Sequence, residues 1–190
     1  MSYVEAGCRC LLVLVFAVSS TSKLRDRAAW RRFTESVAGL APVQRLATTP
    51  TAVAVVAAEV ATTLALAIEP TARVGFATAA GILVALTSAV IIAYRRERRV
   101  QCACFGSGSV VGPRHVVRNA ILGAVAVAGL LTASGDPGFA VLPPGVHPAG
   151  AAIAIVAGLL GGIVMIMFDD LVELFAPAPV RAGTPQREPQ

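Results

Sequence analysis

The chain has little charge and no polar stretch long enough to form a soluble domain of its own. Only 14% of its 190 residues are charged, whereas 56% are hydrophobic, a composition typical of an integral membrane protein. The sequence also lacks a glycine-rich phosphate loop, a heptad seam and a repeat of fixed length. These absences give no support to a nucleotide-binding enzyme, a coiled coil or a repeat protein.

Long apolar stretches make up most of the chain. A helix that spans a membrane needs about 20 predominantly apolar residues. Five stretches meet this requirement, at residues 4–22, 50–69, 72–94, 114–133 and 149–168. We therefore predict an all-α, polytopic membrane helix bundle over residues 1–175, with four core transmembrane helices plus a fifth C-terminal one. The polar, proline-rich residues 176–190 are predicted to form a disordered tail. We expect the first stretch to be retained as a helix, because no convincing signal-peptide cleavage site follows it.

Positive charge is concentrated in two of the connections between these stretches. Six cations lie in the first, Lys23, Arg25, Arg27, Arg31, Arg32 and Arg45, and six in the third, Arg95, Arg96, Arg98, Arg99, Arg114 and Arg118. Because cytoplasmic loops carry the excess of Lys and Arg, we expect both connections to face the cytoplasm of a cell membrane, with the N-terminus outside. The net charge of +5 is then explained by topology and by contact with anionic lipid headgroups. It does not imply nucleic-acid binding.

The segment between the first two stretches is predicted to form an amphipathic helix at the membrane interface. Over residues 26–40, Trp30, Phe33, Val37 and Leu40 fall on one helical face. We expect Trp30 to lie at the level of the lipid headgroups. The segment is best explained as a lid or belt that holds the bundle, and a specific docking site is the alternative.

Glu59 lies near the middle of the second apolar stretch. An ionised carboxylate there would cost roughly 3 kcal/mol or more unless it were paired or protonated, so we expect it to face the bundle interior. It is a candidate proton acceptor or polar partner for a ligand. The structural alternative is a neutral carboxyl that is hydrogen-bonded to Thr62, Thr63 or a neighbouring helix.

Other polar and small residues in the stretches have simpler explanations. Lys23, at the end of the first stretch, is expected to snorkel to the interface as an anchor, and the same explanation applies to Arg118 and Asn119 at the start of the fourth. Gly158 and Gly162 have the four-residue spacing that lets helix backbones approach closely. This spacing predicts close packing inside the bundle, and it leaves open a homodimer face.

The four cysteines form two pairs of equal spacing. Cys8 and Cys10 lie in an apolar helix, where side chains two residues apart point to different faces, so we expect small hydrophobic side chains rather than a disulfide. In contrast, Cys102 and Cys104 belong to the loop segment Cys102-Ala103-Cys104-Phe105-Gly106. The arginines upstream and the helix expected from near Pro113 favour reactive thiolates. Cys102 and Cys104 are therefore a candidate redox pair.

Metal binding is the competing chemical explanation for Cys102 and Cys104. A closed zinc site needs four ligands, and His115 is the one additional ligand nearby in the sequence. We therefore assign no metal site, while two thiolates remain a candidate transient copper(I) site. The structural alternative is that both cysteines pack the loop against the membrane.

Four of these features occur together in one known family. Lys23 after the first stretch, Glu59 in the second, the Cys-x-Cys-Phe-Gly segment and Arg118-Asn119 resemble the MauE/DoxX-like family of redox-associated membrane proteins. The resemblance covers the chain to about Phe175. It implies a role in methylamine utilisation or a related maturation system, in which the family member supports a disulfide-rich secreted partner. The family usually has glycine where Ala103 stands, and the chain lacks the Cys-x-x-Cys of quinone-linked disulfide oxidoreductases.

We therefore expect an accessory protein of thiol–disulfide exchange, in which one thiolate of the pair attacks a partner disulfide and the other resolves the intermediate. The charge pattern places the thiols inside, although maturation of a secreted partner needs them outside, and we keep the charge-based orientation. Electrons would come from a cytosolic thioredoxin-like protein and pass to a quinone or another membrane component. The alternatives are a non-enzymatic assembly scaffold, which would not need the thiols, and a small-molecule carrier that uses Glu59.

Overall fold

The computed structural model describes residues 3–40, 48–95, 101–102, 109–110, 113–133 and 147–175. The helices are α1 (Tyr3–Leu24), α2 (Arg27–Leu40), α3 (Thr48–Ala67), the short 3₁₀ helix η2 (Glu69–Thr71), α4 (Ala72–Arg95), α5 (Pro113–Thr132), α6 (Pro148–Ile166) and α7 (Phe168–Phe175). Two short strands, β1 (Gln101–Cys102) and β2 (Ser109–Val110), pair antiparallel. The domain boundaries stay a prediction, and the predicted tail lies outside the described residues.

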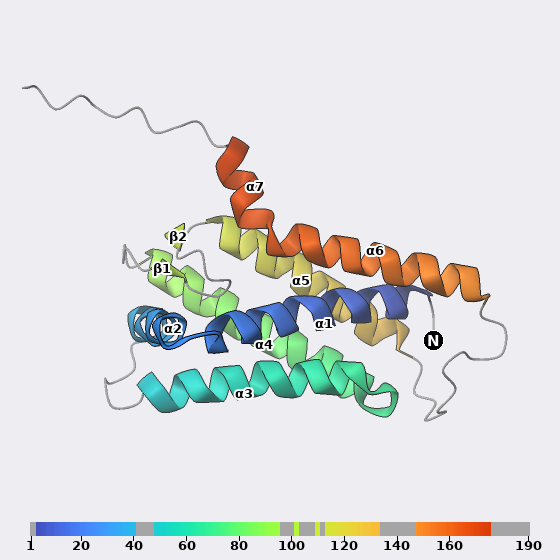
Figure 1. Cartoon of the computed structure of the whole chain (residues 1–190), viewed down its shortest axis with the longest axis horizontal. Helices are drawn as coiled ribbons and strands as arrows, with labels where there is room; N and C mark the ends of the chain where they lie inside the picture. The colour runs from blue at the N-terminus through green and yellow to red at the C-terminus, as the bar shows by residue number, and fades with distance from the viewer. Residues whose placement is uncertain are drawn as a thin grey trace, which may run out of the picture.

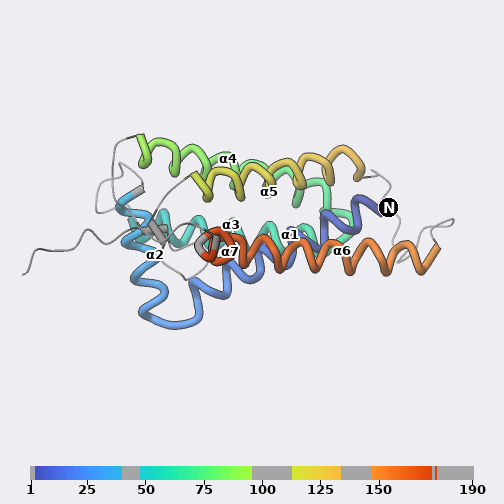
Figure 2. Tube along the Cα trace, turned by 90° about the horizontal axis from the view of Figure 1, so that it is seen from above, coloured from blue at the N-terminus to red at the C-terminus, as the bar shows by residue number. Residues whose placement is uncertain are grey.

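Five of the helices are long and apolar enough to cross a membrane: α1, α3, α4 together with η2, α5 and α6. They run along the long axis of the molecule, and α2 lies across one end (Figure 1). In the perpendicular view α4 and α5 form one side and α6 the opposite side, with α1 and α3 between them (Figure 2). The predicted all-α, polytopic membrane helix bundle is therefore confirmed.

The main core lies where α1 meets α3, α4 and α5. It contains large buried side chains from each of these helices, including Leu12, Phe16, Leu66, Phe76 and Leu122. Small residues let the helices approach, and a methyl group in place of a hydrogen on Gly129 would collide with the ring of Phe76. The buried side chains therefore pack closely and leave few voids in the interior.

Glycines also hold α6 against α1. A Cβ atom on Gly158 would collide with the carbonyl oxygen of Gly7, and one on Gly162 would lie 2.9 Å from Cδ2 of Leu14. Only hydrogen fits at these contacts, so the two backbones pack closely, as in other small-residue helix pairs. The two glycines expected to mediate close packing therefore act inside the bundle, and a homodimer stays a prediction.

α2 covers the end of the bundle at which α1 finishes. Asp26 precedes the helix and its Oδ1 accepts a hydrogen bond from the backbone N–H of Ala29 at 2.7 Å, which is the arrangement of an N-cap. On the apolar face, Phe33 is buried against Ala52 and Val56 of α3. This face packs on protein, as the lid interpretation requires. The depth of Trp30 relative to a membrane remains a prediction.

The C-terminal helices differ from the continuous stretch that we predicted at 149–168. α6 ends at Ile166, Met167 leaves the helical conformation with φ −85° and ψ 2°, and α7 follows. α7 points away from the axis of α6 (Figure 1). Its first turn contains Asp169 and Asp170, so the chain turns where the apolar sequence gives way to acidic residues.

Candidate functional site

A buried ion pair joins α1 to α3. The Nζ of Lys23 lies 2.5 Å from Oε1 of Glu59, and each residue is 1% exposed. The hydroxyl of Ser19 donates to the same carboxylate oxygen at 3.2 Å, and the ammonium of Lys23 donates to Ser19 Oγ at 3.1 Å. Three polar groups from two helices thus form a closed network in an apolar bundle. Such a network neutralises Glu59 by charge pairing.

The lid helix α2 closes this ion pair from one side. The ammonium of Lys23 lies 4.7 Å from the centre of the Phe33 ring, a distance at which a cation is attracted to an aromatic face. Phe33 is itself 4% exposed. α2 therefore contributes a ring to the environment of the pair, in addition to its packing on α3.

The structure corrects one expectation here and confirms another. Lys23 does not snorkel to an interface, because its ammonium turns inward to Glu59. Glu59 faces the bundle interior as expected, and its carboxyl bonds to a neighbouring helix rather than to the nearby threonines: the hydroxyl of Thr62 bonds to Thr78 on α4, and that of Thr63 donates to the backbone carbonyl of Glu59. A lysine 36 residues away in the sequence is the partner instead, and it also fills the position that a carried ligand would need at Oε1.

A second buried ionic cluster lies at the start of α5. Arg118 Nη1 is 2.6 Å from Oδ2 of Asp169 on α7, and His115 Nε2 is 4.0 Å from the same oxygen. Arg118 is 2% exposed and Asn119 is 7% exposed. The expectation that both reach the membrane interface as anchors is therefore wrong. Asp169 was missed by sequence reasoning, because it lies just beyond the last apolar stretch and no local pattern indicates its partner on α5.

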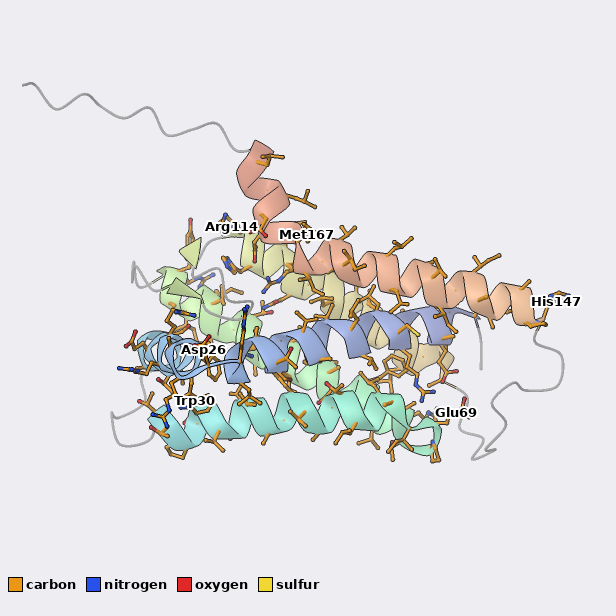
Figure 3. All side chains as sticks on the ribbon, in the orientation of Figure 1. Asp26, Trp30, Glu69, Arg114, His147 and Met167 are labelled. Carbon is orange, nitrogen blue, oxygen red and sulfur yellow. The ribbon has the colours of Figure 1, made fainter. Side chains whose placement is uncertain are left out.

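At the opposite end of the bundle, Arg9 caps the C-terminus of α3. Its Nε donates to the carbonyl oxygen of Leu66, and Nη2 donates to that of Ala67 at 2.6 Å. Glu69 of η2 lies 3.8 Å from Nη1. These contacts satisfy carbonyl groups that the end of a helix leaves without backbone partners. Figure 3 shows Glu69 and His147 at this end, and Asp26 and Trp30 at the end that α2 covers.

The cysteines are separated between the two ends. Cys8 and Cys10 are free and half-buried in α1. The backbone of Cys102 belongs to β1 and pairs with Ser109 of β2, beside α2. Cys104, Phe105 and Gly106 lie outside the described residues, so the Cys102/Cys104 pair stays a prediction. Among the residues that the structure describes, no three or more His, Cys, Asp or Glu side chains gather as metal ligands.

These features define a polytopic membrane protein with two buried ionic clusters and a short hairpin that contains a cysteine. The chain belongs to the family of the methylamine utilisation protein MauE, whose family model matches residues 1–132. This confirms the family resemblance seen in the sequence. The match includes α1 to α5, whereas α6 and α7 lie beyond it. Comparison with curated proteins gave no match, and comparison with solved structures gave none either.

Proposed function

We propose that this protein is a membrane accessory protein of thiol–disulfide exchange, which supports the maturation or redox upkeep of a partner through Cys102 and Cys104. The observation that carries the proposal is the position of Cys102 in the β1–β2 hairpin, inside the part of the chain that matches the MauE family. The hairpin is connected to α4 on one side and α5 on the other. Cys102 therefore lies between two helices that are long and apolar enough to span a membrane.

The exchange needs two thiols and a disulfide on the partner. One thiolate attacks a partner sulfur, so that the partner disulfide breaks, a mixed disulfide forms and one partner thiolate leaves. The second cysteine then attacks the mixed disulfide, which forms the Cys102–Cys104 disulfide and releases the reduced partner. Two electrons pass to the partner, and the reverse sequence oxidises it. Protons lost from the two thiols are taken up by the partner thiolates.

The buried ion pair gives Glu59 a specific place in this proposal. Oε1 of Glu59 is bonded to Lys23 and Ser19, whereas Oε2 is buried and has no hydrogen-bond partner among the described residues. Oε2 is therefore the atom at which the carboxylate would accept a proton. In this role Lys23 and Ser19 hold the carboxylate in place through Oε1.

The orientation and the redox partners follow from charge. Twelve of the sixteen cations belong to the first and third connections, and the positive-inside rule favours a cytoplasmic side for both connections. In this orientation a thioredoxin-like protein of the cytosol would reduce the Cys102–Cys104 disulfide again after a partner has been reduced. In the reverse direction a quinone in the cell membrane would take the two electrons from the thiols after a partner has been oxidised. The MauE family points to methylamine utilisation as the setting in which to test these partners.

The proposal is tested by trapping the mixed disulfide. In a chain with Cys8→Ser and Cys10→Ser, the single variants Cys102→Ser and Cys104→Ser are expressed separately in cells grown on methylamine, and the lysates are acid-quenched and separated without reductant. We expect one single variant to accumulate a reducible adduct with a partner, since its resolving thiol is missing. We expect the variant that lacks both cysteines to form none and to lose maturation of the partner.

Two results would overturn the proposal. One is normal partner maturation with both Cys102 and Cys104 replaced by serine, which would indicate an assembly scaffold instead. The other is the absence of adduct from both single variants at wild-type levels of protein in the membrane. Labelling of intact cells with a membrane-impermeant maleimide tests the orientation separately. Labelling before permeabilisation would place the thiols outside and reverse the charge-based topology.

A further inference from the structure

The second ionic cluster has a feature that the proposed exchange does not use. At the start of α5, the side chains of His115 and Arg118 face the carboxylate of Asp169. All three residues are at most 6% exposed, with His115 and Arg118 at 2% each. A buried arginine at 2.6 Å from a carboxylate oxygen is a strong, charge-assisted contact. His115 and Arg118 therefore make a buried contact with a single carboxylate.

The two α5 side chains of this site and the carboxylate that they face come from different parts of the chain. His115 and Arg118 lie on α5, inside the region that matches the MauE family, whereas Asp169 lies on α7, beyond residue 132 where the match ends. His115 and Arg118 also have further interactions besides those with Asp169. Asp169 is therefore not the whole support of these two side chains, both of which lie in the family-matched unit.

Asp169 uses only part of its hydrogen-bonding capacity in this site. Oδ2 faces both Arg118 and His115, but Oδ1 is buried without a hydrogen-bond partner among the described residues. A buried acceptor without a partner costs free energy, so Asp169 is an imperfect occupant. It is also carried by a short helix that follows a break at Met167, and Leu174 of that helix is 78% exposed. Figure 3 shows Met167 and Arg114, at the start of α5, on the same side of the bundle.

We propose that His115 and Arg118 form a carboxylate-binding site of the α1–α5 unit, and that Asp169 of α7 is its built-in occupant in this chain. The ligand class is a single carboxylate, because one carboxylate fills the site and the planar guanidinium of arginine matches it. A carboxylate from a small molecule or from an acidic side chain of another protein would compete with Asp169 for the same two side chains, His115 and Arg118. The proposal does not depend on thiol exchange, because neither cysteine of the pair takes part in it.

Replacement of the occupant tests the site. Asp169→Ala removes the carboxylate and leaves space for a small one, and acetate is the probe. Full-length wild type and variant are purified in detergent, and the midpoint of thermal unfolding is measured in sodium acetate and in sodium chloride at equal ionic strength and pH. We expect the variant to unfold at a lower temperature than wild type in chloride. We expect acetate at about ten times its dissociation constant to raise that midpoint by roughly 3 °C over chloride.

The controls separate a specific site from a general salt effect. Wild type should show no gain from acetate over chloride, because Asp169 fills the site, and the double variant Asp169→Ala with Arg118→Gln should show none because the cation is absent. Asp170→Ala is the matched control, since Asp170 is an exposed aspartate in the same turn. It should unfold like wild type in both salts.

Equal midpoints in acetate and chloride for Asp169→Ala would overturn the proposal, and so would an equal acetate gain in the double variant. If Asp169→Ala does not fold in chloride, the yield of folded protein from cells lysed in acetate replaces the midpoint as the readout. Asp169→Asn keeps the size of the side chain and should not respond to acetate, because the amide occupies the space. A response of this variant as large as that of Asp169→Ala would also contradict the proposal.

Discussion

A buried ion pair between Lys23 and Glu59 predicts a different effect of mutation from a Lys23 that only anchors the helix at the membrane interface. We consider Lys23→Met, which keeps the length of the side chain and removes its charge. In the structure this change leaves the carboxylate of Glu59, 1% exposed, with Ser19 as its remaining side-chain partner among the described residues. An uncompensated buried charge is strongly unfavourable, so the variant should be much less stable than wild type.

The size of the loss follows from the burial of both partners. Breaking a buried ion pair by removing one member costs about 3–5 kcal/mol, whereas a surface substitution usually changes stability by less than about 0.5 kcal/mol. Removal of both charges should cost less than removal of one, because no uncompensated charge then remains. We therefore expect Lys23→Met with Glu59→Gln to recover part of the stability that Lys23→Met alone loses.

Stability is measured by reversible unfolding in mixed micelles of increasing SDS content, followed by far-ultraviolet circular dichroism. Arg25→Met is the matched control, since Arg25 is an exposed cation two residues further along the chain, and it should unfold like wild type. The reasoning is refuted if Lys23→Met unfolds like Arg25→Met. It is also refuted if the double variant is less stable than Lys23→Met, since the two charges would then not act as a pair.

Two further predictions concern helix packing and the lid. Gly158→Leu should destabilise the protein by about 1–3 kcal/mol or more, because its Cβ would collide with the backbone of Gly7, and SDS unfolding measures the loss. Gly81→Ala, at a position with no atom within 4 Å of the added carbon, should be neutral or stabilising by up to about 1 kcal/mol. Asp26→Ala should increase hydrogen exchange at the start of α2, because the N-cap bond to Ala29 is lost.

The N-cap also predicts a dependence on pH. The hydrogen bond from the Ala29 backbone N–H lowers the pKa of Asp26, with help from Arg32 and Arg25. A carboxyl whose pKa is lower in the folded chain than in the unfolded chain stabilises the folded chain at pH values above the ordinary carboxyl pKa. This contribution is lost as the pH falls through the lowered pKa. The protection of α2 amides against hydrogen exchange, taken relative to the intrinsic rate at each pH, should therefore fall in acid in wild type. In Asp26→Ala this protection is already reduced and should show no such additional fall. An equal fall of protection in both proteins would count against the cap.

The opposite outcome for either glycine variant would contradict the packing described above. Wild-type stability of Gly158→Leu would show that α6 can move away from α1 at little cost, and the close contact with Gly7 would then not hold the two helices together. Strong destabilisation by Gly81→Ala would show that α4 meets another surface at that position.

Several features could be predicted from local sequence because each depends on residues that are close together in the chain. The spanning helices follow from apolar runs long enough to cross a bilayer, in which the backbone must bond to itself. α2 follows from the spacing of Trp30, Phe33 and Val37, which have to share one face of any helix. The close packing of Gly158 and Gly162 follows in the same way from their spacing, although its partner helix does not.

The partners of the buried charges were decided by tertiary structure alone. Glu59 meets Lys23 and Arg118 meets Asp169 because α1 packs against α3 and α7 folds back on α5, and these pairs are 36 and 51 residues apart. Local sequence assigned each cation to an interface, since a long side chain near a helix end can reach water. Whether it turns inward depends on which carboxylate the neighbouring helices bring within reach, and that is a property of the whole bundle rather than of any one segment.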